Sequence, residues 1–355
     1  MNRDAGRGGM LFVTVTVDDG KKLPFVLDTG CPITSIDESL EPKLGKLVRT
    51  ETVWSFGIPF HANIYPTPTL YLGKTPLTKT GPDIAAFDYK AMSSMVGRPI
   101  MGILGMDILQ NYCIQLDFTA DKINFLDSEH SSHHGWGKSF PLLSVGDGCC
   151  SIIDNLANTP GAGSLIDTGC NYDGWLVPDL YSHWTNQNGS LENGEVRSPF
   201  GKLGGQNYSP LDLHGLDPKL YSSGDQHIQF NGLGLRFLSR NLVTFDFPNL
   251  TMYLKCTSAG PLPGVASIDL KSPIKFLKKL KARGQLPGWL KNDEVGDNNR
   301  ITTNLSGLVD VEAHKKGDSS TYHYQMDETP DGQWELLKAW RTNPAGQTIT
   351  EYPAP

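Results

Sequence analysis

The chain has 355 residues, enough for two or three compact units that each bury a core of their own. Its formal net charge of −7 argues against nucleic acid or an anionic membrane surface as the main partner, because both carry negative charge themselves. The 38 glycines and 24 prolines favour many short strands joined by turns over long helices.

No apolar run comes near the roughly 18 residues that cross a bilayer, so we expect no membrane span. The first residues, Met1–Asp4, lack the apolar stretch of a secretory signal. Two compartments fit this sequence: the cytoplasm as it stands, or a secreted or periplasmic location if a leader has been removed. The six cysteines show no metal-binding spacing, so we expect reduced thiols and no metal or other cofactor.

Two segments of the chain repeat each other. Residues 24–31 and residues 163–170 are apolar runs that both end in Asp-Thr-Gly-Cys. Each is followed by an apolar segment with a central glycine, Gly105 in the first half and Gly234 in the second. An Asp-Phe strand comes next, and in both halves its aspartate lies 12 residues after that glycine. Because order and spacing both recur, the sequence predicts two equivalent structural units.

The elements along both halves are predominantly strand-like. Residues 11–17 alternate with period two and end at Asp18-Asp19-Gly20, which predicts a strand and a hairpin turn. Residues 69–77 predict another strand–turn–strand. The only strong helix signal before residue 260 is the short turn at Gly105–Gln110 and its counterpart in the second half. The pattern therefore predicts a mainly β protein.

The repeat divides the chain into an N-terminal lobe at 1–127 and a second lobe at 137–256. The stretch Asp127–Gly135 joins them and holds three histidines. A metal-binding tract is one interpretation of these histidines. A solvated linker is favoured, because no acidic or cysteine ligand cluster accompanies them.

After Cys256 the periodicity changes to that of a helix followed by strands. Ser272 and Pro273 suit the start of a helix, Gly284 suits its end, and apolar residues between them form a stripe. Strand-like runs follow at 301–311, 321–326, 334–340 and 348–352. We therefore predict a small α+β accessory domain at 260–355, a helix plus an antiparallel meander, in which we find no chemical motif.

The repeated Asp-Thr-Gly strings suit acid–base hydrolysis of a peptide bond. Two carboxyls about 3 Å apart share one proton, because like charges that close cannot both ionise. The ionised member accepts a proton from water, while the protonated member hydrogen-bonds the substrate carbonyl. Asp28 and Asp167 are the candidates. The hydroxyls of the neighbouring threonines can bond the opposite loop, and the glycines permit the tight turn.

On these residues the chain resembles the pepsin-like aspartic peptidases, with two retropepsin-like units fused in one chain. The resemblance covers about residues 10–256; a single Asp-Thr-Gly is weak, but the paired and ordered set is specific. It implies a two-lobed β-barrel architecture, a peptide or protein substrate, and a monomer, since both aspartates are in one chain. It also implies Asp28 and Asp167 as the catalytic dyad, supported by Thr29, Gly30, Thr168 and Gly169.

The family's substrate-covering hairpin, the flap, should lie between the first motif and Gly105. Trp54-Ser55-Phe56-Gly57 is the candidate for substrate binding, and an exposed hairpin with a packed tryptophan is the alternative. The chain departs from the family where Cys31 and Cys170 replace the usual Ser or Thr, and its lobes are shorter. Both departures bear on substrate range and pH optimum.

The leading functional hypothesis is an active aspartic endopeptidase. A catalytically silent peptide-binding protein on the same fold is the alternative, and a pepstatin-type transition-state mimic helps to separate the two. In a third hypothesis the C-terminal domain is the functional centre and the lobes are a scaffold. It has little support, because that domain shows no cluster of titratable residues.

Overall fold

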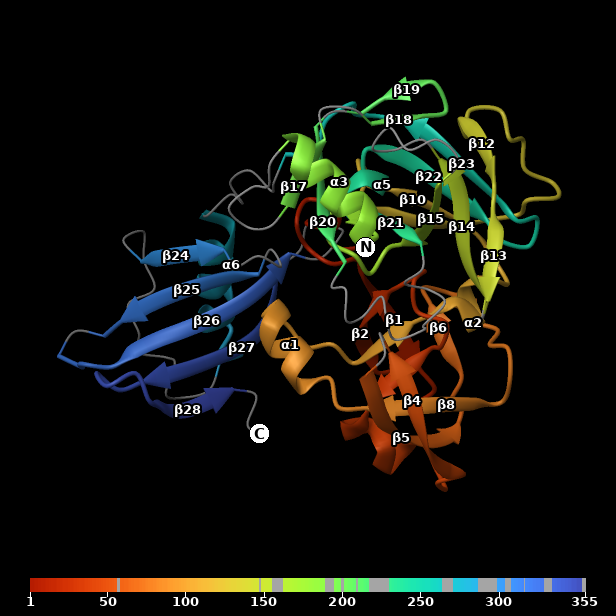
Figure 1. The fold of residues 1–355 in the computed structure, drawn as a ribbon. Coiled ribbons are helices and arrows are strands. Elements are labelled where there is room, and N and C mark those ends of the chain that lie inside the picture. The colour runs from red at the N-terminus through yellow and green to blue at the C-terminus, as the bar shows by residue number, and fades with distance from the viewer. Residues whose placement is uncertain are drawn as a thin grey trace. The chain divides into compact units, whose positions relative to one another are not determined.

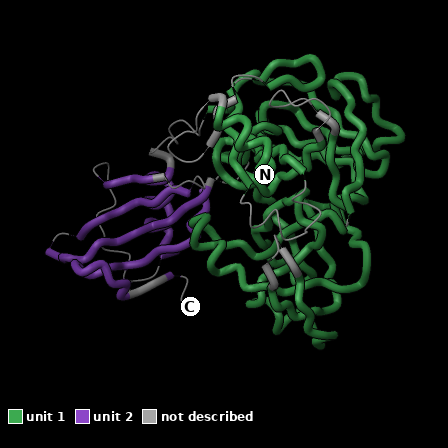
Figure 2. Tube along the Cα trace, viewed as in Figure 1, with its two compact units in different colours: residues 1, 3–263 green, residues 2, 264–355 purple. Residues whose placement is uncertain are grey.

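The computed structural model describes residues 1–55, 58–146, 148–154, 162–188, 195–198, 201–208, 210–216, 230–263, 271–286, 299–303, 308–315, 317–328 and 334–352. The chain is mainly β, with 46% strand and 15% helix, which confirms the predicted class. It forms two compact units (Figure 2). The first comprises residue 1 and residues 3–263, and the second comprises residue 2 and residues 264–355.

A nine-stranded sheet contains the first Asp-Thr-Gly segment. Its strands, in spatial order, are β4 (Arg49–Ser55), β5 (Ile58–Pro66), β8 (Asp83–Phe87), β3 (Ser35–Asp37), β9 (Gly102–Leu104), β2 (Lys22–Leu27), β1 (Phe12–Val17), β6 (Leu70–Leu72) and β7 (Thr75–Pro76). β1 and β2 form the predicted hairpin, and Gly20 in its turn has a φ of 77°, which glycine adopts without steric cost. Along β1, Val13 and Val15 are buried and Thr14 is exposed, as the period-two alternation requires.

A seven-stranded sheet repeats this arrangement around the second Asp-Thr-Gly segment. Its spatial order is β13 (Leu143–Gly146), β14 (Cys149–Asp154), β15 (Ala162–Asp167), β21 (Asn231–Gly234), β16 (Gly174–Leu176), β20 (Leu211–Gly215) and β17 (Glu195–Ser198). In both sheets the strand leading into Asp-Thr-Gly lies parallel to the apolar-glycine strand, β2 to β9 and β15 to β21. The next strand, β3 or β16, pairs antiparallel with that same strand and parallel with one more. The sequence repeat is therefore also a repeat of strand pairing.

A third sheet joins the two halves of the first unit (Figure 1). Its order is β11 (Lys122–Leu126), β10 (Cys113–Asp117), β22 (Asn241–Asp246), β23 (Thr251–Cys256) and β12 (Lys138–Pro141). β10 and β22 are the two Asp-Phe strands of the repeat, and they pair antiparallel with Cys113 opposite Asp246. Buried residues of all three sheets belong to one hydrophobic core. A small ribbon of β18 (Lys202–Leu203) and β19 (Gln206–Asn207) belongs to the same unit.

The predicted β-barrels do not occur as closed sheets. Among the described strands, β4 and β7 are the edges of the nine-stranded sheet, and β13 and β17 are the edges of the seven-stranded one. A barrel requires its first and last strands to hydrogen-bond to each other. None of the sheets makes that pairing in the described part of the chain, so the strands form open, mixed sheets instead.

Helices are more numerous than the sequence patterns indicated. The two predicted turns are present as α2 (Met106–Leu109) and α5 (Leu235–Leu238). Among the described residues, three further helices precede residue 260, namely a 3-10 helix η1 (Glu38–Lys43), α1 (Lys90–Val96) and α3 (Pro178–Asn188). α1 is only seven residues long and buries no side chain fully, so its apolar residues Met92, Met95 and Val96 form too short a pattern to predict a helix. Within the described residues, no helix has the length and apolar character needed to cross a bilayer.

The second unit is a helix with one antiparallel sheet, as the C-terminal pattern predicts. α6 (Lys271–Ala282) is followed by β24 (Arg300–Thr303), β25 (Val309–His314), β26 (Thr321–Glu328), β27 (Trp334–Thr342) and β28 (Thr348–Tyr352), paired in sequence order (Figure 1). Ile274 and Leu277 of α6 join Val311 and Tyr324 in a core that belongs to this unit alone. The run predicted as one strand at 301–311 is two strands, with residues 304–307 outside the described residues.

Candidate active site

The two Asp-Thr-Gly loops leave central strands of the nine- and seven-stranded sheets. The Asp28 N–H donates to the carbonyl of Leu104 on β9 at 3.0 Å, which holds the first loop beside the apolar-glycine strand. In the second half, Asp167 lies opposite Gly234 in the parallel pairing of β15 with β21. The same local pairing therefore delivers both aspartates.

Hydrogen bonds between the threonines join the two loops. The Thr29 N–H donates to Oγ1 of Thr168 at 3.0 Å, and the Thr168 N–H donates to Oγ1 of Thr29 at 3.1 Å. Each hydroxyl then donates across to a carbonyl just before the opposite aspartate, Ile166 for Thr29 and Leu27 for Thr168, both at 2.8 Å. Both threonines are buried. Because every donor here is satisfied by the other loop, neither loop can move alone without leaving buried polar groups unpaired.

The carboxyl groups of Asp28 and Asp167 lie within hydrogen-bonding reach of each other. The Gly30 N–H donates to Oδ1 of Asp28 at 2.8 Å, and the Gly169 N–H donates to Oδ1 of Asp167 at 2.7 Å. The glycines are needed for this approach. A Cβ atom at Gly30 would lie 2.6 Å from Cγ of Asp167, and one at Gly169 would lie 2.4 Å from Oδ2 of Asp28.

The two carboxyls differ in how tightly they hold a proton. Burial raises the pKa of both, because it disfavours the charged form. The pKa of Asp167 is raised well above its usual value, since the negative charge of Asp28 and the hydrogen bond between the carboxyls add to the effect of burial. For Asp28, the same hydrogen bond and backbone N–H groups lower the pKa and so oppose the effect of burial. Because the two carboxyls are adjacent, one shared proton belongs to the pair.

Gly105 and Gly234 lie directly behind the two loops. A Cβ atom at Gly105 would be 2.6 Å from the carbonyl oxygen of Ile33, and one at Gly234 would be 2.2 Å from that of Tyr172. Any larger side chain would push the loop backbone forward. These two glycines therefore pack closely under the loops.

The cysteines that follow Asp-Thr-Gly bond to the backbone of their own loops. The Cys31 thiol donates to the carbonyl of Ile33 at 3.2 Å, and the Cys170 thiol is hydrogen-bonded to the backbone of Tyr172. Within the described residues, neither thiol hydrogen-bonds to a carboxylate. Burial raises the pKa of both thiols, so they are neutral and poor nucleophiles.

The predicted flap lies on the hairpin of β4 and β5. Trp54 and Ser55 end β4, and their backbones pair with Pro59 and Ile58. Phe56 and Gly57 lie outside the described residues, as do the side chains of Trp54 and Ser55. The substrate-binding role of these four residues therefore stays a prediction.

An apolar cluster links this hairpin to the first Asp-Thr-Gly loop. Ile33, five residues after Asp28, packs with Val53 of β4 and Phe87 of β8 against Ala62, Ile64 and Ala85. The equivalent position in the second loop is Tyr172, which is 46% exposed, with its ring 3.6 Å from the His214 ring between centroids. The first loop therefore packs on an apolar cluster, whereas the second carries a partly exposed pair of aromatic rings at the equivalent position.

Two buried polar pairs beneath the loops were missed by the sequence reasoning. Oδ1 of Asp107 accepts the N–H of Thr34 at 2.8 Å and its hydroxyl at 2.6 Å. In the second half, the fully buried guanidinium of Arg240 holds both oxygens of Asp173 at 2.6 and 2.7 Å. The partners lie 73 and 67 residues apart, so no local sequence pattern connects them.

Two histidines of the segment between the two halves contact different partners. The His130 ring contacts the Asp127 carboxylate at 2.8 Å, while the His133 ring packs on Trp136 with 4.4 Å between centroids. In the part of the chain that the structure describes, no three His, Cys, Asp or Glu side chains are grouped as metal ligands.

Comparison with known proteins adds no assignment, since no protein-family model and no curated protein matches the chain.

Proposed function

We propose that this protein is an aspartic endopeptidase of the pepsin-like type, acting through Asp28 and Asp167. The observation that carries the proposal is the pair of adjacent carboxyls, Asp167 buried and Asp28 partly exposed, delivered by two equivalent loops that the threonines tie together. A purely structural role would not explain the pair, because burying two adjacent carboxyls without a counter-charge costs stability.

The proposed reaction uses the one shared proton, which we assign to Asp167. Asp28 removes a proton from a water molecule as the water oxygen attacks the substrate carbonyl, and Asp167 gives its proton to the carbonyl oxygen. In the resulting geminal diol, Asp28 passes its newly gained proton to the amide nitrogen. The C–N bond breaks, and Asp167 recovers a proton from a diol hydroxyl. Both aspartates return to their starting states.

The repeated strand pairings support a two-lobed architecture, with lobes at 1–127 and 137–256 and an accessory domain at 260–355. An extended peptide would lie across the dyad, and one chain would suffice because it carries both aspartates. The apolar cluster around Ile33, Val53 and Phe87 favours an apolar substrate side chain on that side of the scissile bond.

The test is cleavage of a peptide library by the full chain at several pH values. We expect cleavage by the parent and by Asp179→Asn, an exposed aspartate on α3 that serves as the matched control. Asp28→Asn and Asp167→Asn should each lose at least about 10³-fold in kcat/KM, because each removes one of the two proton-transfer roles. A parent that binds a pepstatin-type mimic but cleaves nothing would instead be the silent peptide-binding protein.

A further inference from the structure

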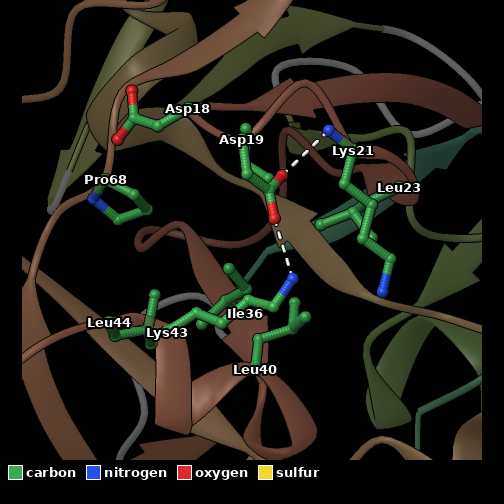
Figure 3. A pocket seen from close by; sticks show the side chains of 10 residues that line it. Asp18, Asp19, Lys21, Leu23, Ile36, Leu40, Lys43, Leu44 and Pro68 are labelled. Atoms are coloured by element: carbon green, nitrogen blue, oxygen red, sulfur yellow. Dashed lines mark hydrogen bonds and ion pairs between the residues drawn. The ribbon is translucent and has the colours of Figure 1, made fainter.

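A cavity of about 410 Å³ opens on the first unit at the end of β2 remote from the dyad (Figure 3). It is lined by residues of the β1–β2 turn, β2, β3, η1 and the loop before β6, namely Val17, Asp18, Asp19, Lys21, Leu23, Ile36, Leu40, Lys43, Leu44 and Pro68. β2 separates it from Asp28, and at about 3.3 Å per residue the turn lies on the order of 20 Å from the catalytic loop. The cavity is therefore a different site.

The floor of this cavity is apolar and belongs to the core. Leu23, Ile36, Leu40 and Leu44 are between 1% and 8% exposed, and all four are members of the main hydrophobic cluster. They come from three separate elements that pack together, so the floor is preformed. Its volume is at the lower end of the range of about 300–1,000 Å³ that is typical of small-molecule sites.

The rim carries two carboxylates; both accept hydrogen bonds, and Asp19 is also paired with a cation. Oδ1 of Asp19 accepts the Lys21 N–H at 2.9 Å, and Oδ2 accepts the Lys43 ammonium at 2.7 Å. Asp18 accepts the N–H of Thr69 at 3.0 Å. The bonds from Lys43 and Lys21 lower the pKa of Asp19, so it stays ionised and held in place.

The two ammonium groups of the rim keep spare donors. Lys43 uses one of its three N–H groups on Asp19, and the Lys21 ammonium makes no ion pair or hydrogen bond with any residue that the structure describes. A cationic ligand would have to compete with Lys43 for Asp19. An anionic ligand can bind the spare donors without breaking a bond.

We propose that this cavity binds a small amphiphile with an apolar chain and a carboxylate head group. The chain lies on the floor of Leu23, Ile36, Leu40 and Leu44, where it is removed from water. The carboxylate lies at the mouth, between the ammonium groups of Lys21 and Lys43. The site is separate from the dyad and does not depend on peptidase activity.

The first experiment is a titration of the full chain, labelled at its Ile and Leu methyl groups, with octanoate by NMR. Octanol and octylamine are the matched probes, because they share the chain and differ only in the head group. We expect octanoate to shift the methyls of the cavity floor and to bind more tightly than either analogue. Equal affinity for octanol, shifts confined to other sites, or no saturable binding would each overturn the proposal.

The second experiment changes the rim without touching the core. Lys21→Gln with Lys43→Gln should weaken octanoate binding about 3- to 10-fold, the size expected for two partly exposed ion pairs, and should leave octanol unchanged. Lys22→Gln is the matched control, since Lys22 is exposed, adjacent in sequence and not part of the lining. If the double variant binds octanoate as the parent does, or if Lys22→Gln weakens binding equally, the lysines do not hold the head group.

Discussion

Replacing both Cys31 and Cys170 with serine should move the acid limb of the pH–rate profile to lower pH. Each cysteine lies in a catalytic loop, but its thiol bonds to the backbone of Ile33 or Tyr172 instead of a carboxylate. A serine hydroxyl is a stronger donor than a thiol and can rotate toward the nearby carboxylate. A hydrogen bond to the ionised form favours that form and lowers its pKa.

The size of the shift follows from the donors already present. A hydrogen bond to a charged group contributes about 1.5–3 kcal/mol, and about 1.4 kcal/mol corresponds to one pKa unit. Asp28 already accepts the Gly30 N–H, and Asp167 those of Gly169 and Cys170, so a further donor adds toward the lower end of this range. We therefore expect a shift of about one pH unit. Because burial raises the pKa of both aspartates, the parent should be most active at weakly acid pH.

The assay is kcat/KM for one cleaved peptide, measured across the acid and neutral range at constant ionic strength. The acid limb reports the ionisation of the dyad in the free enzyme. Cys31→Ala with Cys170→Ala is the control, since alanine offers no donor and should leave the limb where the parent has it. A serine profile that overlays the parent's, or a parent that peaks near pH 2, would refute this account of the cysteines.

Three further predictions follow from the site and the two units. Thr29→Val should lower the free energy of unfolding by about 2–4 kcal/mol, because it leaves the Thr168 N–H buried without its acceptor. Thr14→Val, on the exposed face of β1, is the control and should change that free energy by less than about 0.5 kcal/mol. Urea unfolding of both variants measures the difference. Asp167→Asn should raise the melting temperature at neutral pH. The pKa of Asp167 is higher in the folded than in the unfolded state, so this carboxyl lowers the stability of the fold as the pH rises above its unfolded pKa. Below about pH 4 both states are protonated, and the gain in melting temperature should vanish. Equal gains at neutral pH and below about pH 4 would contradict this. A chain ended after Pro263 should keep peptidase activity, since the dyad and its supports lie in the first unit; a well-folded but inactive truncation would argue against it.

The repeated motif made the candidate site predictable, because an apolar strand followed by Asp-Thr-Gly specifies both local backbone and chemistry. Asp28 and Asp167 could be named from sequence for that reason. The Asp173–Arg240 pair could not, because its partners meet only through tertiary packing and neither carries a sequence pattern. The helix α1 was not predicted for a different reason: it has only seven residues, and the apolar spacing of Met92, Met95 and Val96 is too short to distinguish a helix from a loop.

Whether the sheets close into barrels could not be predicted from the sequence either. The period-two alternation of β1 predicts which side chains face the core, but it does not specify which strands lie at the edges of a sheet. The barrel expectation came with the family resemblance, and the described strands form open sheets instead. Strand pairing over the whole chain depends on contacts between distant segments, which a single strand pattern does not encode.

The two Asp-Thr-Gly loops have the same sequence, but their carboxyls are held differently. Oδ1 of Asp167 accepts the N–H groups of both Gly169 and Cys170, whereas Oδ1 of Asp28 accepts that of Gly30. Asp167 is buried, whereas Asp28 is partly exposed. An N–H donor favours the ionised form of a carboxylate and burial disfavours it, so these two differences act in opposite directions on Asp167. Because the two carboxyls are adjacent, one proton belongs to the pair, and the pH–rate profile of the proposed hydrolysis reports the ionisations of the pair.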